Sequence, residues 1–354
     1  NVSQTALKQH SILLWDEANK LFYVGCEDIR RDSKNCDNDF NDLVFFIKSN
    51  PVKAISKENV PPADDGYDSD GDGVSDVLDE FPNDATLAYR NFIPSEGSFG
   101  TLSYEDCWPG KGDYDFNDLV LGYQYEQLVD ANNKVKKMEA RFAIRAIGAH
   151  YHHGFGFQLK TSSSNVQSVS GYSLTENKVS LNSNGTEQGQ NQATFIVFEN
   201  DFKFMNRSKG QFFNTTSTDA FVNPDTVKLS INFSKALSNS DLGAVPYNPF
   251  IYVGGDRGKE VHLSGYEPTQ LADTSYFNTY HDNTKPGQGI YYKTLTGLPY
   301  AVHVGTEYEY PLERKSIHKG YLKFTTWASS GGSLFKDWYM VKSGYRDSQK
   351  LFKR

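Results

Sequence analysis

The sequence predicts an all-β protein, an antiparallel β-sandwich of the jelly-roll or immunoglobulin-like kind with calcium-binding loops and a short β segment in front. Short runs of aromatic and β-branched residues recur along the chain, and turns rich in Gly, Ser and Asn separate them. Convincing helical periodicity is almost absent. A chain of 354 residues is long enough for one large core or two smaller ones.

The expected strands are the most apolar of these runs, and the alternation of apolar and polar residues is clearest at residues 228–233. The predicted strands cover residues 21–24, 43–47, 119–125, 139–145, 193–198 and 227–233. The long polar stretches at residues 161–192 and 265–288 are expected to be surface loops that can carry binding residues.

Composition divides the chain into three predicted parts. Residues 1–50 form a short β segment, residues 51–91 form a linker with an Asp-rich loop, and residues 92–354 form the sandwich domain. The linker is assigned because residues 50–67 contain Pro, Asp and Lys with little hydrophobic periodicity.

The Asp-rich loop that begins at residue 68 matches the spacing of a twelve-residue calcium loop. Gly73 supplies the sharp turn at position 6, and Val74 offers its carbonyl at position 7. The expected ligands are Asp68, Asp70, Asp72, Val74, Asp76 and Asp79. A helical EF-hand would end on Glu between amphipathic helices, and this chain has neither, so the loop is closer to thrombospondin type 3 and dockerin-like repeats. The alternative is a solvated acidic linker.

An acidic pattern, Asp-x-Asp-Phe-Asn-Asp-Leu-Val, occurs twice, at residues 37–44 (box 1) and 113–120 (box 2), each behind an upstream Glu-Asp pair. Oxygen ligands without His or Cys suit calcium better than zinc or copper. The expected ligands of box 1 are Glu27, Asp28, Asp37, Asp39, Asn41 and Asp42. Those of box 2 are Glu105, Asp106, Asp113, Asp115, Asn117 and Asp118. Metal-free Asx turns are the alternative, but turns alone do not need so many carboxylates.

Alternation within each box is expected to place the ligand oxygens on one side and Phe40 or Phe116 on the other, toward the core. The Leu-Val pair then opens a strand. The sequence therefore predicts two related calcium sites, each directly before a strand.

The formal net charge of −8 comes largely from these acidic clusters, and no dense Lys/Arg stripe suggests a nucleic acid partner. No apolar run approaches the roughly 20 residues that cross a bilayer, and residues 1–10 carry no signal-peptide pattern. Calcium sites of ordinary design favour an exported protein, because extracellular calcium is millimolar. Cys26 and Cys36 could form a disulfide or remain buried thiols, and Cys107 has no evident partner.

Two further features of the sequence concern catalysis and transition-metal binding. His150, His152 and His153 could bind a transition metal, but adjacent residues of a strand face opposite ways and no acidic residue is near in sequence, so a glycine-rich turn is favoured. No nucleophile, nucleotide or zinc-protease motif is present, so the protein is not expected to be an enzyme. A glycosidase carboxylate pair has no fixed spacing and stays an open alternative.

The Asp-rich loop, Phe-Pro at residues 81–82 and the Trp-Pro-Gly-Lys-Gly-Asp-Tyr-Asp-Phe-Asn-Asp run at residues 108–118 resemble an LruC domain. Gly-Phe-Gly-Phe at residues 154–157 and Trp-Ala-Ser-Ser-Gly-Gly at residues 327–332 continue the resemblance, which covers about residues 68–350. Residues 11–48 resemble the C-terminal part of another bacterial extracellular domain family. The resemblance implies a bacterial, exported or surface-associated, calcium-binding β protein, without a settled activity.

Together these observations predict a calcium-dependent extracellular binding or adhesion module, with surface carbohydrate as the expected ligand class. In that role, calcium would fix the loops before two strands and so lower the entropy lost on binding. A calcium-rigidified structural unit of a larger envelope or adhesin assembly is the alternative, and a glycoside-acting enzyme is a third.

Overall fold

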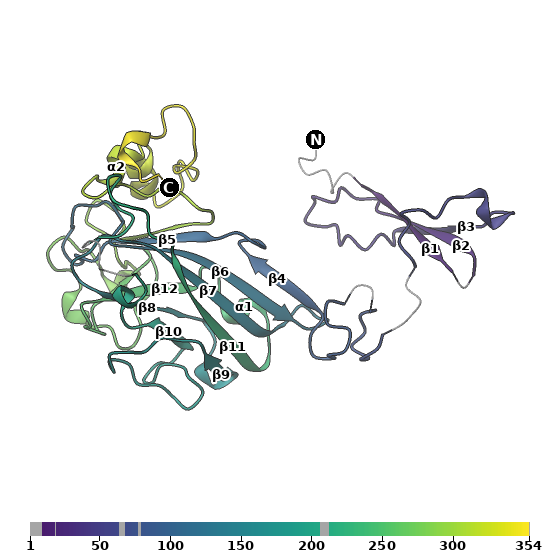
Figure 1. Ribbon diagram of the computed structural model, residues 1–354, viewed down its shortest axis with the longest axis horizontal. Coiled ribbons are helices and arrows are strands. Elements are labelled where there is room, and N and C mark those ends of the chain that lie inside the picture. The colour runs from purple at the N-terminus through teal and green to yellow at the C-terminus, as the bar shows by residue number, and fades with distance from the viewer. Residues whose placement is uncertain (1–8, 18, 64–67, 77–78, 206–211, 354) are drawn as a thin grey trace. The chain divides into compact units, whose positions relative to one another are not determined.

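The computed structural model describes residues 9–17, 19–63, 68–76, 79–205 and 212–353. They form two compact units, Asn1–Ala88 and Tyr89–Arg354, which are described separately. Both units are built mainly from antiparallel β-sheets, and the helices are short (Figure 1). The protein is therefore all-β, as the sequence predicted.

The first unit contains one antiparallel sheet in the order β1-β2-β3. Its strands are β1 (Ser11–Asp16), β2 (Leu21–Cys26) and β3 (Leu43–Ile47). Trp15 of β1 packs on Phe22 of β2 with ring centroids 4.7 Å apart, and both rings are buried. This pair is the core of the small sheet.

The stretch expected as a linker belongs in part to this sheet. The Trp15 amide donates to the Pro61 carbonyl at 2.8 Å, and the Ala63 amide donates to the Trp15 carbonyl at 2.6 Å. A short 3-10 helix, η2 (Val52–Ala54), lies in the same stretch. Residues 61–63 therefore cover the outer edge of β1, which a linker read from polarity alone does not predict.

The second unit contains a seven-stranded sheet, ordered β14-β5-β6-β7-β11-β9 with β4 also paired to β6, and a four-stranded sheet, ordered β10-β8-β12-β13. The strands of the larger sheet are β4 (Tyr89–Ile93), β5 (Gly100–Tyr104), β6 (Leu119–Val129), β7 (Val135–Ile147), β9 (Val166–Ser170), β11 (Asp225–Leu237) and β14 (Ala301–Val304). Those of the smaller sheet are β8 (His153–Gln158), β10 (Thr194–Phe198), β12 (Asn248–Val253) and β13 (Glu260–His262).

The main core lies between these two sheets. Phe142 of β7 packs edge-on against Phe155 of β8 with centroids 4.9 Å apart, and Tyr125 of β6 contacts Phe157 of β8 at 5.8 Å. β6 is buried along its whole length because it lies in the middle of the larger sheet. Aromatic and β-branched side chains fit such a two-layer core, and the result is a β-sandwich.

A second core lies under the C-terminal segment, which we define as residues 305–353, after β14. It packs Phe116 and Tyr114 of box 2 against Ile317, Phe324 and Trp338. The short helices here are α2 (Ile317–Gly320) and α3 (Phe324–Ser329), and α1 (Asn239–Leu242) follows β11. The C-terminal segment therefore holds box 2 against the edge of the sandwich.

All six predicted strands are present, but two predictions about connections are wrong. Residues 166–170, expected in a surface loop, form β9 at the edge of the larger sheet. The His-rich stretch expected as a turn runs into β8, where His153 is fully buried. In both places pairing with a distant strand outweighs the local Gly, Ser and Asn content.

Candidate metal centres

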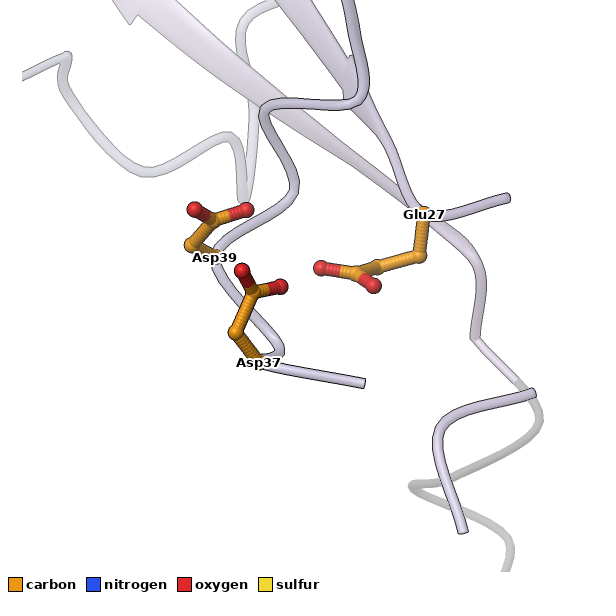
Figure 2. A group of neighbouring side chains, drawn as sticks. All are labelled: Glu27, Asp37 and Asp39. Atoms are coloured by element: carbon orange, nitrogen blue, oxygen red, sulfur yellow. The ribbon is translucent and has the colours of Figure 1, made fainter. Parts of the chain in front are cut away.

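Box 1 brings three carboxylates together at the ends of β2 and β3. Oxygens of Glu27, Asp37 and Asp39 all lie within 4.8 Å of one another. Figure 2 shows Glu27 reaching from the end of β2 toward the two aspartates on the loop. We call this group cluster 1. It is a compact, oxygen-only group of the kind that binds a hard cation.

Hydrogen bonds to the backbone fix this arrangement. The Phe40 amide donates to Glu27 Oε1 at 2.7 Å, the Asn41 amide to Asp39 Oδ1 at 3.0 Å, and the Asp28 amide to Asp42 Oδ2 at 2.9 Å. Asn38 and Phe40 have left-handed backbone with φ of 62° and 58°. Such backbone is uncommon for a large residue such as phenylalanine, so the loop is held by its contacts rather than by local preference.

Box 2 repeats the three backbone hydrogen bonds of this arrangement. Oxygens of Glu105, Asp113 and Asp115 lie within 4.8 Å of one another, and we call this group cluster 2. The Phe116 amide donates to Glu105 Oε1 at 2.7 Å, and the Asp106 amide donates to Asp118 Oδ2 at 2.7 Å. The Asn117 amide donates to Asp115 Oδ1 at 3.2 Å, and Tyr114 and Phe116 have φ of 69° and 55°. The repeated sequence pattern therefore corresponds to a repeated three-dimensional loop.

Burial makes cluster 2 electrostatically costly. The pKa of Glu105 is raised well above its ordinary value, first by burial and then by the charge of Asp115. Burial, followed by Asp113, raises the pKa of Asp115 to about 8. Burial, followed by Asp106, also raises the pKa of Asp118. Carboxylates crowded in this way are stable as anions only beside a cation, so the site fits a bound metal ion.

Cluster 2 also has a contribution from the far end of the chain. The Arg314 amide donates to Asp115 Oδ2 at 2.6 Å, and the Asn117 Nδ2 donates to the Pro311 carbonyl at 3.1 Å. Burial, followed by the charge of Asp113, raises the pKa of Glu313, and one of its oxygens is buried without a hydrogen-bond partner. A cation at cluster 2 would therefore have a further carboxylate nearby that the sequence pattern did not indicate.

The Asp-rich loop forms a third group, in which oxygens of Asp68, Asp70 and Asp72 lie within 4.8 Å of one another. Asp68 accepts the amides of Gly71 at 2.8 Å and Gly73 at 3.0 Å. These glycines have φ of 80° and 97°, which only glycine adopts readily. The turn predicted from the glycine at position 6 is present.

Orphaned oxygens provide a test of whether this loop fits a cation. One oxygen each of Asp70, Asp72 and Asp79 is buried and has no hydrogen-bond partner. The other oxygen of each accepts a backbone amide, from Asp72, Val74 and Phe81 respectively. Buried carboxylate oxygens are rarely left unpaired, so the free set fits a calcium ion.

Several predicted ligands lie outside these three groups. Asp76 accepts from the Ser69 amide at 2.8 Å and from the Ser69 hydroxyl at 2.6 Å, so in this conformation it holds the start of the loop. Asp42 accepts a hydrogen bond from the Asp28 backbone amide, and Asp118 accepts one from the Asp106 backbone amide. Asp28 is likewise not among the grouped carboxylates. Asn41 Nδ2 donates to Asp39, and Asn117 Oδ1 is buried without a hydrogen-bond partner, so it is available to a cation.

Asp106, a predicted ligand outside cluster 2, faces a buried histidine. His153 lies between Asp106, with Nε2 to Oδ2 3.3 Å, and Asp201, with Nδ1 to Oδ2 2.7 Å. Burial disfavours the charged imidazolium, but the two carboxylates outweigh it and raise the pKa of His153 to about 10. No acidic residue is near this histidine in the sequence, and both carboxylates come from distant parts of the chain, so the sequence did not indicate them.

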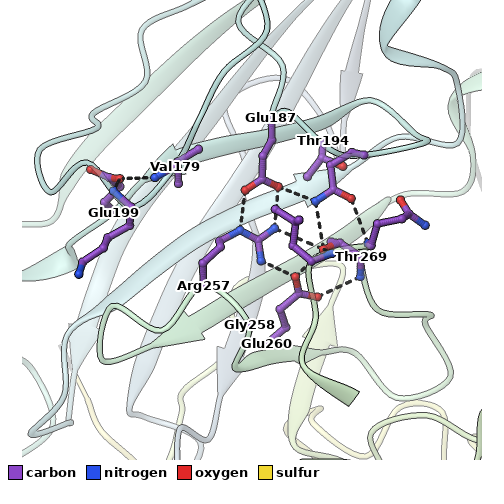
Figure 3. A network of polar contacts seen from close by, with 12 residues as sticks. Val179, Glu187, Thr194, Glu199, Arg257, Gly258, Glu260 and Thr269 are labelled. Atoms are coloured by element: carbon purple, nitrogen blue, oxygen red, sulfur yellow. Dashed lines mark hydrogen bonds and ion pairs between the residues drawn. The ribbon is translucent and has the colours of Figure 1, made fainter. Parts of the chain in front are cut away.

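A second buried network fixes the polar loops of the sandwich. Arg257 lies between Glu187, at 2.6 Å from Nε, and Glu260, and the Thr269 amide donates to Glu260 at 3.0 Å (Figure 3). Burial acts to raise the pKa of Glu260, but bonds from His262 and Arg257 lower it to about 2. The ion pairs of Arg257 link the predicted surface loop at residues 161–192 to β13, and the Thr269 hydrogen bond links the one at residues 265–288. The sequence signal for this buried network was the presence of two ionisable residues, Glu260 and His262, in the three-residue strand β13.

A groove of about 510 Å³ lies on the second unit beside the C-terminal segment. Aromatic side chains and two arginines share its walls, and Arg145 pairs with Glu307 while Arg346 pairs with Glu309. The lining includes Phe221, Tyr308, Tyr310, Tyr339, Arg145 and Arg346. This groove could not be predicted from the sequence, because residues of strand β7 and of several separate later segments form it.

Comparison with known proteins assigns families without a known activity. The chain belongs to the family described as "Domain of unknown function (DUF4842)", whose model matches residues 133–339, more than half of the chain. The model of a "Domain of unknown function (DUF4114)" matches residues 1–50, which contain box 1. A search of the curated proteins found no match.

One solved structure has a similar fold. It is described as the "Crystal structure of a Putative lipoprotein from Bacteroides ovatus", and it superposes with a TM-score of 0.55 at 19% sequence identity. The match covers 75% of this chain and 76% of the other. At this identity the similarity concerns the fold alone. No helix in the described parts of the chain is long and apolar enough to span a membrane.

Proposed function

We propose that the protein is a calcium-binding module of the bacterial cell surface that binds a ligand, with carbohydrate as the ligand class. The observation that carries the proposal is the acidic loop built twice. In both copies a Glu accepts a Phe amide at 2.7 Å beside two Asp carboxylates. Two loops with the same unusual backbone and the same crowded oxygens are best explained if each loop binds a cation of the same kind.

Calcium suits these groups better than other metals do. The grouped ligands are all carboxylates, without the His or Cys ligands that favour zinc or copper. Magnesium usually keeps several waters and uses only one or two carboxylates. The orphaned oxygens of the Asp-rich loop support the same ion, in keeping with the resemblance to thrombospondin type 3 loops and LruC domains. Three such sites fit an exported protein bathed in millimolar calcium.

The groove supports a ligand-binding role that depends on calcium. Glu309 and Tyr310 line it, and the same segment continues to Arg314, whose amide bonds Asp115 in cluster 2. A cation at cluster 2 would therefore order one wall of the groove. Aromatic rings combined with fixed donors and acceptors suit a sugar, which has an apolar face and a hydroxyl rim.

Burial of cluster 2 favours a second candidate function, a calcium-rigidified structural unit. Glu105 and Asp115 are almost fully buried, and both accept backbone hydrogen bonds. An ion bound there would link the sandwich to its C-terminal segment rather than offer an open coordination position to a ligand. In this case the groove would have no small-molecule partner.

A glycan-binding screen in calcium and in chelator separates these functions. We expect glycan binding that is lost in EGTA and lost in Phe221→Ala, which alters the groove, but kept in Tyr280→Ala, which alters an exposed tyrosine outside it. Absence of glycan binding, together with a calcium-dependent rise in melting temperature, would favour the structural unit. An unchanged melting temperature in EDTA would contradict calcium binding itself, and sugar release would indicate an enzyme.

A further inference from the structure

The second unit (unit 2) has another pocket, of about 270 Å³, which shares no lining residue with the groove described above. Three parts of the chain that are distant in sequence meet around it. Leu263 and Ser264 follow β13, Ala301 and His303 belong to β14, and Trp327 belongs to α3. We call this pocket the β14 pocket.

The walls of the β14 pocket are largely apolar. They include Val245, Pro246, Leu263 and Ala301. An apolar cavity of about 150 Å³ is large enough to bind benzene. The β14 pocket can therefore hold a small ring or a short chain, with room for one polar group at its end.

The polar groups of the β14 pocket are mainly donors. Lys293 is half-buried, and neither its ammonium nor the Trp327 indole N–H bonds to another described residue. Among the described residues that line the pocket, Lys293 is the only one with a permanent charge, and none is Asp or Glu. An ammonium that is partly removed from water gains from a charge-assisted hydrogen bond to an anion. The lining therefore favours an acceptor with a negative charge.

His303 adds a neutral donor. Burial lowers the pKa of His303 to about 4, so the imidazole is uncharged near neutral pH. Its Nε2 lies 2.6 Å from the Tyr123 hydroxyl, whose only hydrogen-bond partner among the described residues is this ring. The hydroxyl therefore donates to Nε2, and the ring proton lies on Nδ1. With a single positive charge, the pocket suits one carboxylate better than a phosphate dianion.

A glycine after α3 keeps the indole nitrogen of Trp327 uncovered. Gly332 has a left-handed backbone with φ of 81°, and its amide donates to the Trp327 carbonyl at 2.9 Å. A side chain at this position would contact Trp327 Nε1. Glycine therefore both ends the helix and leaves the N–H accessible from the pocket.

We infer that the β14 pocket binds a small organic carboxylate with an apolar body. The Lys293 ammonium pairs with the carboxylate, the neutral donors of His303 and Trp327 bond its oxygens, and the apolar walls cover the body. A neutral sugar fits less well, because its hydroxyls need acceptors and the polar side chains here are mainly donors. The inference rests neither on calcium nor on carbohydrate binding.

Benzoate is the probe, added to the full chain while the indole N–H signals are followed by NMR. We expect the Trp327 signal, assigned with Trp327→Phe, to shift on titration. Benzamide has nearly the same shape without the charge, and we expect it to bind about tenfold or more weakly. Lys293→Met should weaken benzoate by a similar factor, whereas Lys293→Arg should retain it. Lys336→Met removes an exposed lysine outside the pocket and should change nothing.

The indole signals of buried Trp108 and Trp338 report whether each variant is folded. Absence of a Trp327 shift with millimolar benzoate would overturn the inference. Equal binding of benzoate and benzamide, or unchanged benzoate binding in folded Lys293→Met, would overturn it as well. Tighter binding of inorganic phosphate than of benzoate would contradict the assignment to a carboxylate. None of these outcomes bears on the calcium sites or the groove, because the titration needs neither calcium nor glycan.

Discussion

Clusters 1 and 2 have the same local structure in two different surroundings. In cluster 1, Asp37 and Asp39 are exposed to water, and only Glu27 is buried. In cluster 2, Glu105 and Asp115 are both buried, and the C-terminal segment covers the loop. Short-range sequence therefore determines the shape of the acidic loop, whereas the surrounding fold determines how strongly its charges depend on a cation.

The largest difference is expected at the upstream aspartates, Asp106 and Asp28. Asp106→Ala removes one of two carboxylates that face buried His153, and breaking a buried ion pair costs about 3–5 kcal/mol. Asp28 is exposed, so we expect Asp28→Ala to change the free energy of unfolding by no more than about 0.5 kcal/mol. Urea denaturation of both variants measures the difference. Equal losses would mean that the histidine does not distinguish the two sites.

The pH dependence of stability should separate the clusters next. Without calcium, Asp115 has a folded pKa of about 8 against an unfolded value of about 3.9, so the folded state holds the extra proton between these values. The stability of chelated unit 2 should therefore fall as pH rises from about 4 to about 8. Bound calcium displaces that proton, so its affinity should rise over the same range.

With calcium at a hundred times its dissociation constant, the gain in stability should reach about 2.7 kcal/mol at the upper pH and shrink toward the lower one. Hydrogen exchange of the Phe116 and Phe40 amides, which bond to equivalent glutamates, compares the two clusters directly. We expect the weaker dependence at Phe40, because water screens exposed carboxylates. Parallel pH profiles at the two amides would contradict the role assigned to burial.

The two glutamates should differ by a smaller amount. Glu105→Ala leaves the buried amides of Tyr114 and Phe116 without an acceptor, and an unsatisfied buried donor costs about 1–3 kcal/mol. Glu27→Ala releases the Phe40 amide and the Cys36 thiol, both in a more exposed loop, and so should cost less. Thermal melts in excess chelator isolate this effect from metal binding. A larger loss for Glu27→Ala would reverse the comparison.

The acidic loops could be predicted from the sequence because their ligands are close together along the chain. The spacing of Asp37 and Asp39, or of Asp113 and Asp115, needs no knowledge of tertiary structure. Strands such as β3 and β6 were equally evident from their apolar runs. Local patterns thus identified the fold class and the position of three candidate sites.

The surroundings of the loops could not be predicted in this way. His153 and Asp201 are 48 residues apart, and Asp115 meets the Arg314 amide across 199 residues. Contacts of this range depend on sheet pairing, which the sequence pattern leaves undetermined.

The smallest expected difference concerns how the second oxygen of each glutamate is held. In cluster 2 the Tyr114 amide donates to Glu105 Oε2 at 3.2 Å, whereas in cluster 1 the Cys36 thiol donates to Glu27 Oε2 at 2.9 Å. The hydrogen bond to Glu27, followed by burial, raises the pKa of Cys36. Neither Cys36 nor Cys26 is in a disulfide, and each is half-buried, so the thiol is free to act as this donor.

Cys36→Ser keeps a donor at this position and Cys36→Ala removes it, so we expect only the alanine variant to weaken calcium binding at cluster 1, and only slightly. Calorimetric titration of both variants measures the change. Gly112 occupies the equivalent position in box 2, where a side chain would collide with Glu105 Oε2. A cysteine there should therefore disrupt cluster 2, which would show that the two loops reached the same geometry with different donors.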